Sequence, residues 1–303
     1  MRAHPDSLRR PMSEPATARP PRLRSVLYMP GANERALVKA RDLPADALIL
    51  DLEDAVAPAA KAEARERVCA AAASGDYGER VVTIRVNAIA TEWHGDDVRA
   101  AAAARPHAIV VPKISRAGDV HAVDGLLRDA GAPERTAIWA MLETPAAVLH
   151  AAEIAGAADR LTVLVMGTND LAAELYADTA PTHPLRAPLL GALSSCVLAA
   201  RARGRTILDG VFNDVRDLDG FAAECRQGRA FGFDGKTLIH PGQVEPCNAA
   251  FSPGADEVAH ARRVIDAFEE AERAGAGVVT VDGRMVENLH VATARRVLAL
   301  AGD

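Results

Sequence analysis

The sequence predicts an α/β fold, a TIM (β/α)₈ barrel with a C-terminal extension made of helices and a hairpin. Three observations predict it. Short apolar runs alternate regularly with helix-like stretches, the runs are apolar throughout, and no G-x-G-x-x-G loop follows the first of them. Strands that are apolar on both faces are typical of a buried parallel sheet, and intervening helices provide its crossover connections. Without a dinucleotide-binding loop, the closed barrel is favoured over the open doubly wound sheet.

Each strand is predicted from an apolar run, and each helix from the mixed stretch that follows. The first strand covers 25–29, ends at Pro30-Gly31, and precedes a helix that carries Arg35 and Lys39. The next four strand and helix pairs are 47–52 with 61–73, 81–86 with 96–104, 108–111 with 117–130, and 137–142 with 146–156. The last strands are predicted at 161–166, 205–208 and 232–237, with helices at 189–203 and 217–227.

The chain divides into three predicted parts. Residues 1–22 hold five prolines and several arginines without the apolar core of a secretory signal, so we expect a disordered arm. Residues 23–250 form the catalytic barrel, close to the ~250 residues that such barrels need. Residues 251–303 form the extension, with a helix at 256–274, a strand at 278–281, a turn at Asp282-Gly283 and a helix from about 287. We expect it to pack on, or reach into, a neighbouring subunit.

Composition excludes several classes of partner. The chain is 49% hydrophobic and 25% charged, as expected for a globular protein with a sizeable core. A net charge of −6 and a pI near 5.9 argue against nucleic acid or an anionic membrane as a partner. No window reaches the ~18 to 20 apolar residues of a membrane span. Four widely spaced cysteines predict reduced thiols, and we expect a cytoplasmic protein.

Polar residues follow several predicted strands, at the end of the barrel where functional residues gather. They are Asp51, Glu53 and Asp54 after the second strand, Arg85 and Asn87 at the third, Lys113 after the fourth, Glu143 after the fifth, and Asn169-Asp170 after the sixth.

Glu143 and Asp170 end neighbouring strands, so their carboxylates are expected to lie close together. Hard oxygen ligands without nearby His or Cys indicate Mg²⁺, and Mn²⁺ fits the same ligands. The alternative for each acid alone is a helix cap or a surface salt bridge. Glu53 and Asp54 have a similar alternative, because acids favour the positive end of a helix dipole.

Seven motifs in order connect these residues to a known family. They are Arg24-Ser-Val-Leu-Tyr-Met-Pro-Gly31, Leu50-Asp-Leu-Glu-Asp-Ala-Val56, Arg85-Val-Asn87, Val111-Pro-Lys113, Leu142-Glu-Thr-Pro145, Gly167-Thr-Asn-Asp-Leu171 and Gly232-Phe-Asp-Gly-Lys-Thr-Leu-Ile-His-Pro241. Over about residues 24–250 the chain resembles the citrate lyase beta subunit and malyl-CoA lyase branch of the HpcH/HpaI aldolase superfamily.

The resemblance implies roles for individual residues. Glu143 and Asp170 ligate Mg²⁺, and Arg85 contacts the oxygens of a bound 2-oxoacid. Substrate-binding residues are expected at Arg24, Asn87 and Lys113. Arg35 and Lys39 lie four apart on one helix face and are expected near the phosphates and pantetheine of a thioester, the alternative being a solvated basic face. Glu53 and Asp54 join Arg85 as expected catalytic residues. Two departures from the family are Asn169, where Glu is more common, and Ala146-Ala147, where Gly is frequent.

The extension carries a further expected catalytic residue. Relatives tend to have Gly-x-Met-Ile-Asp-x-Pro there, with an Asp that reaches a neighbouring subunit's metal site, and this chain has Gly283-Arg-Met-Val-Glu-Asn288. Glu287 stands where that Asp would be. The alternative is a first-turn acid that opens the final helix. The resemblance also implies a homo-oligomer, a trimer or a dimer of trimers.

We therefore expect a Mg²⁺-dependent carbon–carbon lyase that cleaves or condenses a malyl-, citramalyl- or citryl-CoA type of 3-hydroxyacyl thioester into an acyl-CoA and a 2-oxoacid. Glyoxylate, pyruvate and oxaloacetate remain open, as does an acyl carrier protein in place of coenzyme A. One alternative is a thioester hydrolase for malyl-type substrates, and another is an aldolase for free 4-hydroxy-2-oxoacids. A partner-binding subunit with a vestigial site is disfavoured by the intact Glu143, Asp170 and Arg85.

Overall fold

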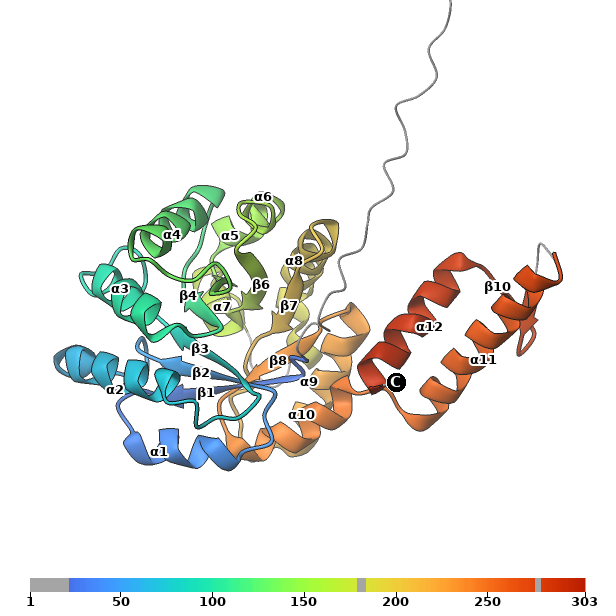
Figure 1. Ribbon diagram of the computed structural model, residues 1–303, viewed down its shortest axis with the longest axis horizontal. Coiled ribbons are helices and arrows are strands. Elements are labelled where there is room, and N and C mark those ends of the chain that lie inside the picture. Colours follow the sequence, from blue (N-terminus) through green and yellow to red (C-terminus); the bar gives the residue numbers. More distant parts are fainter. Residues whose placement is uncertain (1–21, 179–183, 276–278, 303) are drawn as a thin grey trace, which may run out of the picture.

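Eight parallel strands form a closed barrel in chain order, with helices around it, which confirms the predicted fold class. A computed structural model of the protein describes residues 22–178, 184–275 and 279–302. Figure 1 shows the barrel with a helical pair projecting from one side. The predicted arm at 1–22 lies almost entirely outside the described residues.

The strands and helices follow the predicted alternation. The barrel strands are β1 (Ser25–Pro30), β2 (Ala47–Asp51), β3 (Val81–Arg85), β4 (Ala108–Val111), β5 (Ala137–Leu142), β6 (Leu161–Met166), β7 (Thr206–Asp209) and β8 (Gly235–Leu238). The helices around them are α1 (Glu34–Lys39), α2 (Lys61–Ala73), α3 (His94–Ala104), α4 (Ala117–Asp129), α5 (Pro145–Leu149), α6 (Ala151–Ala155), α7 (Thr168–Glu174), α8 (Leu190–Ala202), α9 (Leu218–Phe231) and α10 (Val244–Phe251).

The two faces of the strands form two separate apolar clusters. One joins strands to the surrounding helices, and the other, with Ile49 and Trp139 among its members, fills the barrel. The inward positions repeat every second residue. Continuing that period along β2, β3 and β5 brings Asp51, Arg85 and Glu143 to the inside at the carboxyl ends of the strands. The two-residue alternation that points apolar side chains into the barrel therefore also points these polar side chains into the site.

Some boundaries differ from the prediction. The eighth strand begins at Gly235 and not at 232, because Gly232 ends α9 in a left-handed conformation with φ of 97°. The predicted helix at 146–156 consists of α5 and α6, separated at His150. Two helices, α7 and α10, follow strand ends where the apolar pattern was too short to predict them.

The C-terminal extension is an antiparallel helical pair with its own core. It contains α11 (Ala255–Arg273), β9 (Val279–Val281), β10 (Arg284–Val286) and α12 (Asn288–Ala301). Ion pairs tie its base to the barrel, Arg229 with Glu257 at 2.6 Å and Arg296 with Asp234 at 2.8 Å. Its tip, with β10, points away from the barrel (Figure 1).

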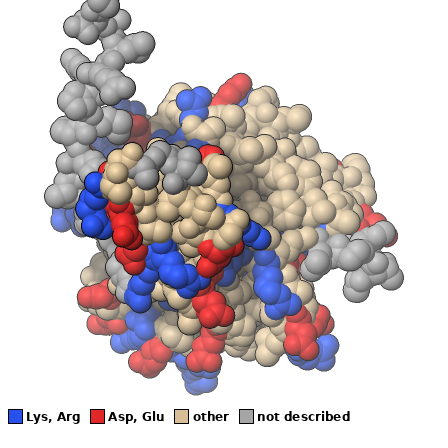
Figure 2. Space-filling view, turned by 90° about the vertical axis from the view of Figure 1, so that its right-hand side faces the viewer, with Lys and Arg blue, Asp and Glu red and all other residues tan. Residues whose placement is uncertain are grey.

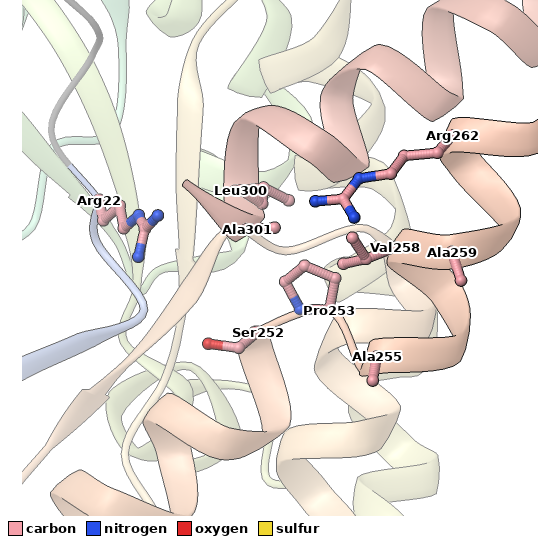
Figure 3. Close-up of a pocket in the computed structure, with 9 residues that line it drawn as sticks. All are labelled: Arg22, Ser252, Pro253, Ala255, Val258, Ala259, Arg262, Leu300 and Ala301. Carbon is pink, nitrogen blue, oxygen red and sulfur yellow. The ribbon is translucent and has the colours of Figure 1, made fainter. Parts of the chain in front are cut away.

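A cavity of about 440 Å³ lies where this extension meets the amino end of β1. Figure 3 shows Arg22 and the α11 residue Arg262 on opposite sides of it. On the face of the molecule seen from the extension, acidic and basic side chains are interspersed (Figure 2). Across the described ranges, no helix is both long and apolar enough to cross a membrane.

Candidate active site

A cavity of about 340 Å³ opens at the carboxyl ends of the strands. Side chains from strands and loops far apart in the sequence meet in it. Its acidic and basic lining residues are Asp51, Asp54, Arg85, Glu143 and Asp170. With Asn169, six of the residues that the strand-end argument selected therefore line one cavity.

Arg85 ends β3 and is nearly buried. Its Nε and Nη2 atoms donate to the two carboxylate oxygens of Asp51 at 2.6 and 2.8 Å, and Nη1 lies 2.7 Å from Glu53 Oε2. Burial opposes the charge of the guanidinium, but the Asp51 carboxylate outweighs burial and raises the pKa of Arg85 further. The planar guanidinium is therefore held on Asp51, and most of its N–H groups are used by protein carboxylates.

Asp51 is the residue that connects Arg85 to the following loop. Its oxygens also accept the backbone N–H groups of Glu53 at 2.9 Å and Ala55 at 3.1 Å. Lys61 supports the same loop, because its Nζ donates to the carbonyls of Leu52 and Glu53. Burial raises the pKa of Glu53 to about 7, against the opposing effect of Arg85. Asp54 stands at the mouth, with 74% of its side chain exposed.

Glu143 follows β5 and is only 2% exposed. Its Oε1 accepts the backbone N–H of Lys113 at 2.7 Å. A Cβ atom on Gly167 would lie 2.2 Å from Glu143 Oε2, so this strand end must carry glycine for the carboxylate to fit. Burial, and then the neighbouring carboxylate of Asp170, raise the pKa of Glu143 to about 8.

The pair Glu143 and Asp170 fits a divalent cation. Burial disfavours the charge of Glu143 and the nearby Asp170 carboxylate repels it, and a cation bound to both carboxylates would offset these two effects. No group of three or more His, Cys, Asp or Glu suited to a metal occurs within the ranges that the structure covers. Mg²⁺ needs only one or two protein carboxylates, with water and substrate oxygens as its other ligands.

The other predicted binding residues lie in different environments. Arg24 lies before β1, at the opposite end of the barrel from the cavity, where it pairs with Asp46 at 2.7 Å and donates to Ser252. Arg24 therefore has protein partners away from the cavity, and substrate binding by this residue stays a prediction. Asn87 is buried behind the site and donates to Leu52 and Asp97.

Three more predicted residues are exposed. Arg35 and Lys39 share one exposed face of α1. Lys113 takes a left-handed backbone conformation with φ of 55°, and its Nζ lies 3.7 Å from Asp170 Oδ1. A non-glycine residue in that conformation carries strain that surrounding contacts must hold. Here the contact is the backbone hydrogen bond to Glu143.

Glu287 begins α12 as its N-cap residue and is exposed. Its backbone N–H donates to His290 Nδ1 at 3.0 Å. Glu287 directly follows β10, which lies at the tip of the extension and away from the barrel (Figure 1), and it is not among the residues that line the cavity.

Sequence reasoning missed four polar side chains of the cavity, of which Thr168 and Thr237 are hydroxyls near strand ends. Tyr28 lines it from β1, and Asn213 lines it from the loop after β7. The amides of Asn213 and Asn169 donate to each other's oxygens at 2.9 and 3.1 Å, next to Asp170. Asn213 lacks a strand-end position that would have indicated it, whereas Tyr28 lies on the inward period of β1.

We predict that Arg85→Lys lowers kcat/KM roughly 10- to 100-fold, because an ammonium cannot hold Asp51 through two parallel bonds and support Tyr28 as well. Steady-state kinetics of purified protein measure this. Arg116→Lys is the matched control, since Arg116 is an exposed arginine paired with Asp119 at 3.1 Å. Equal rates for wild type and Arg85→Lys would show that the reaction does not depend on the Arg85 guanidinium.

Comparison with known proteins agrees with this geometry. A model of the HpcH/HpaI aldolase/citrate lyase family matches residues 24–241. The chain is 54% identical to a (3S)-malyl-CoA thioesterase of Cereibacter sphaeroides, covering 92% of this chain and 94% of the relative. It is 36% identical to citrate lyase subunit beta of Escherichia coli, over 92% and 93% of the two chains.

The chain is also similar to a solved structure that contains ligands. The protein CitE from Mycobacterium tuberculosis, in complex with magnesium, acetoacetate and coenzyme A, is 31% identical with a TM-score of 0.74. The match covers 92% of this chain and 98% of that one.

Proposed function

Because the chain belongs to the HpcH/HpaI aldolase/citrate lyase family, we propose that it is a Mg²⁺-dependent hydrolase of a malyl-type coenzyme A thioester. The main structural support is that Glu143 lies buried beside Asp170, in the same cavity as the Arg85–Asp51 pair. Hydrolysis replaces carbon–carbon cleavage as the first choice, since the 54% identical relative is a named thioesterase, while an L-malyl-CoA/beta-methylmalyl-CoA lyase is 33% identical. Cleavage of the same substrate class is the second candidate.

Each site residue has a distinct part in this proposal. Glu143 and Asp170 hold Mg²⁺, which when bound supplies a Lewis acid for oxygens of the substrate. Arg85, held by Asp51, faces the acid half. Asp54, which lines the cavity, and Glu53, which pairs with Arg85 and whose pKa lies near 7, are the two acids that we propose take a proton from water.

The reaction balances as follows. The water oxygen bonds to the thioester carbonyl carbon, the carbon–sulfur bond breaks, and the sulfur leaves as a thiol with one proton. In the alternative reaction the 3-hydroxyl loses its proton, the carbon–carbon bond breaks, and the thioester's α-carbon is protonated. A carboxyl group able to take up and return a proton serves either route.

The carrier half of the substrate is placed on α1. Arg35 and Lys39 present two cationic side chains on one exposed helix face, which suits the phosphates of coenzyme A. The structure of a relative with coenzyme A bound supports this carrier over an acyl carrier protein. We further propose a homotrimer or hexamer, in which the extension of one subunit brings Glu287 to the cavity of the next.

A product analysis tests the function. Purified protein with Mg²⁺ is incubated with malyl-, methylmalyl-, citramalyl- and citryl-CoA, and products are followed by mass spectrometry. Hydrolysis yields free coenzyme A and the intact hydroxy acid, whereas cleavage yields an acyl-CoA and a 2-oxoacid. Cleavage products alone would replace the proposal by the lyase function, and no turnover of any thioester would refute both.

Glu53 gives a pH-dependent prediction. Its pKa is about 7 in the folded protein, above the ordinary carboxyl value, because burial disfavours the charge. Because the folded state binds this proton more tightly than the unfolded state, the protonated carboxyl stabilises the fold at low pH. That stability is lost as the pH rises through the pKa of the folded protein. In EDTA we therefore expect the free energy of unfolding of Glu53→Gln, relative to wild type, to increase by about 2 kcal/mol between pH 4.5 and 8.

Thermal or urea unfolding at several pH values measures that difference. Glu79→Gln is the control, because Glu79 is exposed at the end of the α2–β3 loop. A constant difference between Glu53→Gln and wild type over the whole range would show that the Glu53 carboxyl ionises like an exposed one.

A further inference from the structure

Tyr28 is the one phenol in the lining of the active-site cavity, among the residues that the structure describes. Its ring lies under the guanidinium of Arg85, with Arg85 Cζ 4.8 Å from the ring centroid. Its hydroxyl contacts the thioether of Met141, with 3.8 Å between Oη and Sδ. A thioether is a weak acceptor, so this hydroxyl retains most of its capacity to donate.

The donors of Arg85 are largely committed to protein carboxylates. A guanidinium has five N–H groups, on Nε, Nη1 and Nη2. Nε and one N–H of Nη2 donate to Asp51, while Nη1 lies 2.7 Å from Glu53 and 3.5 Å from Asp54. One N–H of Nη2 remains for a substrate. A carboxylate needs more than one donor for a defined orientation, so a second donor must come from elsewhere.

The charges around Arg85 also indicate that a second donor is needed. Asp51, Glu53 and Asp54 surround one guanidinium, so the cavity wall around Arg85 has no surplus positive charge for an anionic substrate. A neutral hydroxyl donor adds a hydrogen bond without attracting another protein carboxylate. Burial raises the pKa of Tyr28, and the phenol therefore stays protonated and able to donate at neutral pH.

We propose that the Tyr28 hydroxyl, together with the remaining N–H of Arg85, binds the carboxylate of the acid half of the substrate. The ligand class is a short 2-oxoacid, or the matching 3-hydroxy acid of the thioester. The inference rests on the proposed function, because it assigns a binding residue to that same site. Tyr28 selects the acid half and leaves the coenzyme A half to other residues.

The test is binding to Tyr28→Phe, which keeps the ring under Arg85 and removes only the hydroxyl. Isothermal titration with Mg²⁺ present measures the dissociation constants of pyruvate, glyoxylate and acetyl-CoA. A hydrogen bond to a charged group makes the expected rise in the Kd of the oxoacid about 10-fold or more. The Kd of acetyl-CoA and the Tm should stay at wild-type values.

Tyr77→Phe is the matched control. Tyr77 is buried away from the cavity and donates its hydroxyl to the Leu37 carbonyl at 3.2 Å, so its loss should leave the oxoacid Kd unchanged. Oxoacid affinity within twofold of wild type in Tyr28→Phe overturns the inference alone. Equal weakening of oxoacid and acetyl-CoA overturns it in favour of a structural role. Wild type that binds neither compound overturns the proposed function as well.

Discussion

Glu143→Ala and Asp170→Ala are each expected to lower kcat/KM by at least about 10³-fold, since each removes one of two protein oxygen ligands from the proposed metal. The fold should persist. Burial and the Asp170 carboxylate raise the pKa of Glu143 to about 8, so removing Asp170 takes away repulsion that the metal-free protein bears. In EDTA, Asp170→Ala should therefore unfold at the same or a higher temperature than wild type.

Two measurements separate this expectation from misfolding. Thermal unfolding with and without Mg²⁺ should show a rise in Tm on metal addition for wild type and none for the two variants. Asp214→Ala, at an exposed aspartate in the loop that follows β7, is the control and should behave as wild type in both assays. Undiminished turnover in either variant, or wild-type turnover that persists in EDTA, would end the metal assignment.

The barrel and much of its site were predictable because one pattern produces both. Fully apolar strands require helices on the outside and side chains on the inside, and the same period of two carries Asp51, Arg85 and Glu143 to the mouth. The backbone of Lys113, bonded to Glu143, lies where the strand-end argument placed it. Such positions follow from local sequence alone.

Arg24 shows what a family motif leaves undetermined. A family motif begins with this arginine, but motif membership does not tell which end of the strand a residue occupies. The residue stands one position before β1, so it lies at the amino end, where Asp46 and Ser252 bind it. The direction of the strand decides at which end of the barrel a charged residue lies, and membership in a motif does not.

Lys236 shows a second limit. It belongs to the last motif, yet it points outward from β8 and is fully buried between the barrel and α9. Its Nζ lies 3.1 Å from Asp209, 2.7 Å from Glu224, and close to the Gly210 carbonyl. This network holds the loop that carries Asn213. These contacts join β8, α9 and the end of β7, which are separate in the sequence, so none of these segments alone predicts them.

The choice between hydrolysis and carbon–carbon cleavage also lies outside motif reasoning. Both proposed reactions would use the same two carboxylates for a metal, the same arginine and a proton-transferring carboxyl group, so the seven motifs fit either. The two reactions differ in whether water attacks the thioester carbonyl, so access of water to that carbon would separate them. Glu287 is the proposed residue that another subunit contributes to the cavity.

Glu287→Gln is expected to lower kcat by ~10²-fold or more, the usual range for loss of a general acid or base. The substitution retains the N-cap position of α12 and its backbone bond to His290, so the extension should keep its structure. Steady-state kinetics and Tm together test this. Glu269→Gln removes an exposed carboxylate from α11 of the same extension and should have no effect on the rate.

The decisive experiment mixes two inactive proteins. Because the tip of the extension points away from its own barrel, Glu287 is proposed to act in the cavity of a neighbour (Figure 1). Co-expression of Glu287→Gln with Glu143→Ala creates some sites with Glu143 from one subunit and Glu287 from the next, and these sites are complete. Partial recovery of activity is therefore expected, whereas each variant alone stays slow. A Glu287→Gln protein with wild-type rates would leave Glu287 as the residue that opens α12, and complementation that fails despite mixed oligomers would place its action outside a shared site.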